Sequence, residues 1–132
     1  MTDEVIKERA KTKSSRSQTK EVISTVRDWD PIVSEWTKRR ASGICDLCNK
    51  EAPFFDKNGK PYLEEHHVIT LADGGPDAIY NTVALCPNCH RKMHVLKSKK
   101  DMDLVQKLLL KYLLADDDHE NIKKYEELFK LD

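Results

Sequence analysis

Two cysteine pairs constrain the fold of this sequence more than any other feature. Each pair has the spacing C-x2-C, Cys45 with Cys48 and Cys86 with Cys89, and residues 49–85 lie between the pairs. Two such pairs supply the four thiolates that tetrahedral Zn²⁺ prefers. Because four protein ligands leave no coordination position open, we expect a structural zinc that holds the intervening segment in place. A dithiol redox pair is the rival interpretation, but it would not explain two pairs.

Length and composition indicate one small domain. The chain has 132 residues, of which 39% are hydrophobic and 35% charged, so its core is modest and needs a staple such as zinc. No apolar run approaches the roughly 18 residues of a membrane span, and the N-terminus does not resemble a signal peptide. We therefore expect a soluble, intracellular protein with no membrane partner, in whose reducing compartment the cysteines bind metal.

Charge is balanced overall but unevenly distributed. Lysine plus arginine equals aspartate plus glutamate at 23 each. Residues 9–20 and 91–100 each hold five basic residues and no acid, whereas acids predominate after residue 100. Basic clusters on both sides of the cysteine region suit a polyanionic partner, although solvated faces explain such runs about equally well.

Turn and capping signals predict an α+β order of elements. A short helix is expected over residues 31–41, strands over 62–69 and 82–85, and a helix from Pro87 to about Lys97. Residues 1–25 are expected to form a flexible basic arm, a linker or a weakly formed helix, and residues 26–100 the central domain. Residues 101–132 are expected to form a helical extension that could complete the core, mediate dimerisation or contact a partner.

Four of the five histidines lie close to the cysteine framework. His90 and His94 are four residues apart on the expected helix, so they share a face and can address one point in space. His66 could join them from the neighbouring strand, which would give an imidazole cluster able to bind a divalent ion, with water completing the shell. Surface or capped histidines are the simpler interpretation of any single one of them.

His67 and Asn81 are expected to act differently. Strand alternation turns His67 away from its neighbour and leaves it free to titrate near neutral pH, which suits a general base. Asn81 stands just before the second strand, where its amide could hydrogen-bond backbone or imidazole and fix the ring, or could simply form a turn.

The segment LEEHHVITLADGGPDAIYNTVALCPNCHRKMH, preceded by GICDLC and APFFDKNGKPY, resembles an HNH endonuclease of the McrA-like kind. The resemblance covers about residues 30–97, with His67, Asn81 and His90 as its signature. It implies a small ββα-metal finger with a four-cysteine zinc site, flanked here by an N-terminal helix and C-terminal helices. It also implies that His66, His90 and, with a His-x3-His helix, His94 bind the catalytic ion, while His67 is the general base and Asn81 the orienting residue.

The implied activity is metal-dependent hydrolysis of double-stranded DNA, by nicking or double-strand cleavage, with Mg²⁺, Mn²⁺ or Ni²⁺ as the catalytic ion. Neighbouring phosphates would be neutralised by Arg91, Lys92, Lys97, Lys99 and Lys100. McrA-like restriction enzymes carry a separate recognition region, which we do not find in this sequence. The chain could be a small bacterial, phage or mobile-element nuclease, with a role in restriction, or the catalytic portion of something larger. A non-catalytic zinc-stabilised DNA-binding module is the alternative. A hydrolase for small substrates would need an apolar pocket that this polar chain can hardly build.

Overall fold

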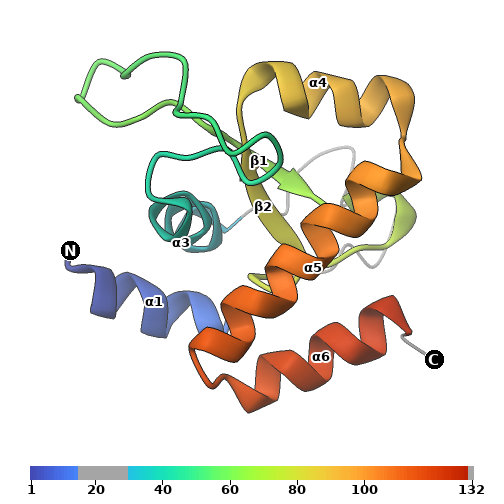
Figure 1. The fold of residues 1–132 in the computed structure, drawn as a ribbon. Coiled ribbons are helices and arrows are strands. Elements are labelled where there is room, and N and C mark those ends of the chain that lie inside the picture. The colour runs from blue at the N-terminus through green and yellow to red at the C-terminus, as the bar shows by residue number, and fades with distance from the viewer. Residues whose placement is uncertain (15–29, 131–132) are drawn as a thin grey trace.

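The computed structural model describes residues 1–14 and 30–130, and its elements surround one two-stranded sheet (Figure 1). The two strands are β1 (Glu64–His67) and β2 (Thr82–Leu85). A single 3-10 turn, η1 (Leu71–Asp73), lies in the loop between them. The helices are α1 (Asp3–Lys11), α3 (Pro31–Ala41), α4 (Pro87–Leu96), α5 (Lys99–Ala115) and α6 (His119–Phe129). The predicted α+β fold class is confirmed.

The helices that position the cysteines and histidines begin where local sequence signals place them. Asp30 caps α3 by accepting a hydrogen bond from the Ile32 N–H, and Pro31 occupies the first turn. Cys86 caps α4 through its Sγ atom, which accepts from the Cys89 N–H, and Pro87 follows it. A proline at the first helical position costs little, because its missing N–H would have no partner inside the helix.

Strands β1 and β2 pair antiparallel, with Glu64 opposite Leu85 and His67 opposite Thr82. β1 is shorter than the expected strand over residues 62–69. β2 is buried along its whole length, because α3 and α5 both pack against it. The sheet is therefore a ribbon whose first strand can still present side chains toward the solvent.

The C-terminal helices complete the core. Val105, Leu109 and Leu113 lie on the inner face of α5 and are at most 2% exposed. Tyr125 of α6 is buried as well, and its hydroxyl donates to the Gln106 carbonyl at 2.8 Å. Of the three roles left open for residues 101–132, core completion is the one that these contacts show.

The first residues of the chain form helix α1, so the helical one of the three alternatives left open for residues 1–25 describes their beginning. Ile6 and Ala10 are buried, and α1 packs against α3. Lys7 also donates to Asp116 at the end of α5, at 2.9 Å. Two buried residues in nine give too short an apolar pattern to predict a helix that tertiary contacts stabilise. The expected boundary near residue 25 lies outside the described residues.

No described helix is both long and apolar enough to cross a membrane.

Candidate metal centre and active site

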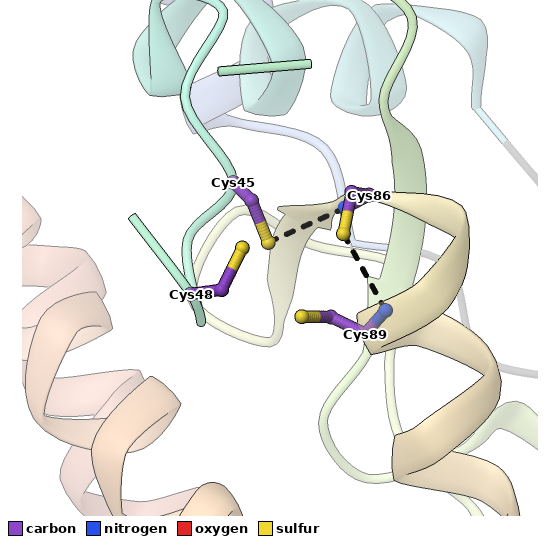
Figure 2. Close-up of side chains that lie close together, drawn as sticks. All are labelled: Cys45, Cys48, Cys86 and Cys89. Atoms are coloured by element: carbon purple, nitrogen blue, oxygen red, sulfur yellow. Dashed lines mark hydrogen bonds between the residues drawn. The ribbon is translucent and has the colours of Figure 1, made fainter. Parts of the chain in front are cut away.

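The four cysteines converge on one point (Figure 2). Cys45 and Cys48 come from the turn after α3, and Cys86 and Cys89 from the beginning of α4. Their sulfur atoms all lie within 4.8 Å of one another, and none is in a disulfide. Cys45 Sγ accepts hydrogen bonds from the backbone N–H groups of Cys86 at 3.3 Å and Leu47 at 3.4 Å.

The chemistry of this donor set fits zinc. Burial raises the pKa of the Cys45 and Cys89 thiols, so without an ion these two cysteines disfavour the thiolate form. The pKa of Cys48 is lowered instead, because burial, which would raise it, is outweighed by hydrogen bonds from the Lys50 backbone and the neighbouring cysteines. A bound dication would reverse the preference of Cys45 and Cys89, because its positive charge stabilises thiolates, and N–H donors to sulfur would offset part of the remaining negative charge. The expected grouping of Cys45, Cys48, Cys86 and Cys89 is what the structure shows.

A second cluster joins His66 of β1 to His90 and His94 of α4. Candidate ligand atoms of the three rings lie within 4.8 Å of one another, and the ring centroids are 5.0 to 5.2 Å apart. Burial, followed by the nearby His90 and His94, lowers the pKa of His66 to about 3. His66 therefore stays neutral near pH 7, and its buried Nδ1 has no hydrogen-bond partner among the described residues. A neutral ring with an unpartnered nitrogen, whose centroid lies 5.1 and 5.2 Å from those of two other imidazoles, suits a divalent ion.

Glu64 orients the His90 ring, and we did not predict it from the sequence. Its Oε1 lies 2.9 Å from His90 Nδ1, and its Oε2 accepts from the Tyr62 hydroxyl at 2.7 Å. The hydrogen bond with His90 lowers the pKa of the Glu64 carboxyl. A carboxylate on one ring nitrogen leaves the other, His90 Nε2, for the cluster, where it lies 3.2 Å from His94 Nε2. The period of two along β1 puts residues 64 and 66 on one side, a signal that could have indicated this partner.

His67 lies on the opposite side of β1. Its Nε2 is 2.8 Å from Oδ1 of Asp77, whose side chain is fully buried, while the His67 side chain is 11% exposed. Glu65 belongs to the same group. Burial and then the charge of Asp77 raise the pKa of Glu65 to about 7. We did not predict Asp77 either, because its contact with His67 depends on the conformation of the long loop between β1 and β2.

Asn81 contacts backbone, and no hydrogen bond joins its side chain to an imidazole of the described residues. Its Oδ1 accepts from the Ile69 N–H, and its Nδ2 donates to the carbonyls of Ile69 and Pro76, each at 2.9 Å. The buried amide thereby closes the loop that carries Asp77. Of the alternatives left open for Asn81, the structure shows hydrogen bonds to the backbone.

The five basic residues expected to meet phosphates all have exposed side chains. Arg91 and Lys92 lie on α4, the helix that carries His90 and His94. Lys97 follows this helix, and Lys99 and Lys100 begin α5. Among the described residues, Lys92 alone of the five is in an ion pair, 3.4 Å from Asp101, and the other four side chains are exposed.

Comparison with known proteins agrees with this geometry. Residues 45–95 match the family model described as HNH endonuclease. The two-stranded ribbon, the helix with its imidazole cluster and the paired cysteines lie within or beside this matched segment, so residues 45–95 are similar to an HNH endonuclease domain.

Two of the proteins to which the chain is similar are McrA restriction enzymes. The chain is 52% identical over 73 residues to the type IV methyl-directed restriction enzyme EcoKMcrA of Escherichia coli, a match covering 55% of this chain and 26% of that protein. It is structurally similar to the type IV phosphorothioation-dependent restriction endonuclease ScoMcrA, with a TM-score of 0.57 and 28% identity over 83% of this chain and 20% of that one. A shorter match, 43% identical over 37 residues, is to anaredoxin of a Nostoc species, covering 28% of this chain and 49% of that protein. The chain therefore spans about a quarter of the length of the McrA relative.

Proposed function

We propose that this protein is a metal-dependent endonuclease that hydrolyses phosphodiester bonds of double-stranded DNA. The observation that supports this best is the division of β1, which sends His66 to the His90 and His94 cluster and His67 to the opposite side of the same strand. A phosphate lying at this end of the ribbon would meet ion ligands on one side and a base on the other.

Histidines of this chain would carry out the proposed hydrolysis. His67 takes a proton from water, whose oxygen forms the new bond to phosphorus, while the bond to the 3′ oxygen breaks and that oxygen takes a proton from solvent. A divalent ion held by His66, His90 and His94 would stabilise negative charge on the phosphate and the departing oxygen. The products are 5′-phosphate and 3′-hydroxyl ends. Imidazole ligands suit several ions, and Mg²⁺, Mn²⁺ and Ni²⁺ are the ones to compare.

The four cysteines are proposed to bind one Zn²⁺ that has a structural role. Cys45 and Cys48 follow α3, whereas Cys86 and Cys89 begin the helix that presents His90 and His94. An ion held by these cysteines would fix the beginning of α4 relative to the turn after α3, and so would help to hold His90 and His94 in place.

DNA is proposed to bind through its phosphates along α4. The exposed lysines and Arg91 carry charge close to the imidazole cluster, and such contacts position DNA without reading its sequence. The names of the McrA relatives tie their activities to modified DNA. We therefore propose a role in restriction, in which this domain cuts and a separate recognition domain selects the modified site. A homodimer stays a prediction.

Plasmid cleavage tests the proposal against the non-catalytic alternative. Supercoiled plasmid is incubated with the protein and Mg²⁺, Mn²⁺ or Ni²⁺, with and without chelator. His67→Ala should keep its fold and zinc content but lose about two to four orders of magnitude in rate, the usual share of a general base. His119→Ala is the matched control, since its side chain is 83% exposed and lies outside both clusters. Binding without cleavage under every ion, or full activity of His67→Ala, would contradict the proposed mechanism.

A further inference from the structure

Asp77 is the most completely buried charged side chain beside the proposed active site. It lies in the loop between the strands, and each of its two carboxylate oxygens has a different partner. Oδ1 is 2.8 Å from His67 Nε2, and Oδ2 accepts from the backbone N–H of Asp30 at 2.6 Å. Because Asp30 caps α3, the carboxylate connects the His67 ring to the beginning of that helix.

These contacts determine which His67 nitrogen carries a hydrogen. A carboxylate can only accept, so Nε2 must donate to Asp77 Oδ1. A neutral imidazole has one N–H, and therefore Nδ1 keeps the free electron pair. The described residues offer no hydrogen-bond partner to Nδ1, which leaves this atom for a ligand.

We propose that Asp77 is the positioning residue of the nuclease reaction, holding the His67 ring in place and in the Nε2–H tautomer so that Nδ1 accepts the proton of the attacking water. This inference rests on the proposed function, in which His67 is the base. Asp77 touches neither DNA nor water in this role and acts only through His67.

The surroundings of Asp77 suit a fixed orientation. The Asp30 N–H prevents the carboxylate from rotating away, and Asn81 closes the same loop through the Ile69 and Pro76 backbone. Hydrogen bonds to a charged group are stronger when water is excluded, and Asp77 has no exposed surface. A preorganised base loses little by reorientation during the reaction.

Asp77→Asn is the decisive variant, because an amide cannot replace both oxygens. If its oxygen faces the Asp30 N–H, its NH₂ faces His67 Nε2 and forces that nitrogen to accept. The hydrogen then moves to Nδ1 and blocks the base. We expect kcat for plasmid nicking to fall about 10²- to 10⁴-fold while KM changes little. Unchanged kcat in a folded Asp77→Asn protein would overturn the proposal.

A matched control separates positioning from stability. Thr37→Val also removes a fully buried hydrogen bond at the same helix, the 2.8 Å contact with Thr82 Oγ1, but touches no histidine. It should lower the unfolding free energy and leave kcat of the folded protein near wild type. In the His67→Ala background, Asp77→Asn should cost no further activity. An equal fold-loss in both backgrounds would assign Asp77 a structural role and overturn the proposal.

The tautomer can also be read in the wild-type protein, which removes any dependence on how the variant folds. Two-dimensional ¹⁵N NMR of the His67 ring should show a protonated Nε2 and an unprotonated Nδ1 in the neutral form. The reverse assignment would overturn the inference whatever the variants do. Failure of the wild-type protein to cleave DNA would instead contradict the proposed function, with the tautomer still measurable.

Discussion

Removing the Asn81 amide should destabilise the loop that carries Asp77, by an amount that can be worked out from its contacts. Asn81→Ala deletes three hydrogen bonds, one to the buried Pro76 carbonyl and two to the partly buried backbone of Ile69. A buried group left unsatisfied costs about 1–3 kcal/mol, and a partly buried hydrogen bond contributes about 1 kcal/mol. The expected loss is therefore about 3–5 kcal/mol, a large share of the roughly 5–15 kcal/mol that stabilises a typical domain.

Urea unfolding followed by circular dichroism measures this loss, provided that the slope with urea is the same in both proteins. Asn81→Asp is the informative second variant, because it keeps an acceptor for the Ile69 N–H but turns an oxygen toward two carbonyls. Its loss should be at least as large. Asn121→Ala is the control, since Asn121 is also buried but lies in α6, where its amide donates to the Lys11 carbonyl and to Asp118 and, among the described residues, makes no hydrogen bond to the loop that carries Asp77. An Asn81→Ala protein within about 1 kcal/mol of wild type would refute the reasoning.

The structure also predicts the direction of the change in stability for several other substitutions and for removal of zinc. A Cβ at Gly75 would lie 1.9 Å from the Ile69 carbonyl oxygen, so Gly75→Ala should cost at least about 2 kcal/mol in urea unfolding. Gly74→Ala, with nothing within 4 Å but φ at +87°, should cost about 1 kcal/mol. Because burial raises the pKa of Glu65 to about 7 from 4.5, the folded state holds a proton there that the unfolded state has already lost. The stability of the wild-type protein should therefore fall as pH rises from about 4.5 to 7. The melting temperature of Glu65→Gln relative to wild type should increase from pH 4.5 to pH 8. A difference in melting temperature that does not change with pH would contradict this prediction. Cys89→Ser or a strong chelator should release the proposed zinc and unfold α4, measured by zinc content and circular dichroism.

The sequence predicted the parts of the site whose members are set by local spacing. Cys86, Cys89, His90 and His94 share one helix, so their relative positions follow from its period, and the Asp30-Pro31 and Cys86-Pro87 signals marked where helices begin. His66 could also be placed near His90 and His94 from the sequence. The strand that carries His66 pairs with the second strand, and the second strand leads directly into the helix that carries the other two histidines.

The parts that were missed depend on contacts between segments distant in the chain. Asp77 meets His67 only because Asn81 and the close approach at Gly75 fold the intervening loop back on Ile69. Helix α1 forms against α3 with two buried side chains, a pattern too short to distinguish from a polar arm. Local spacing carries no information about either arrangement.

The short strand β1 explains how one segment can serve two chemical roles. Its period of two places Glu64 and His66 toward α4, where three imidazoles gather, and places Glu65 and His67 toward Asp77. Imidazoles that bind an ion and an imidazole that accepts a proton need different surroundings. A β-strand provides both, because neighbouring side chains point to its opposite faces. A shift of one residue in the pairing of β1 with β2 would exchange the two sets, so the register that sets His67 opposite Thr82 is itself part of the proposed active site.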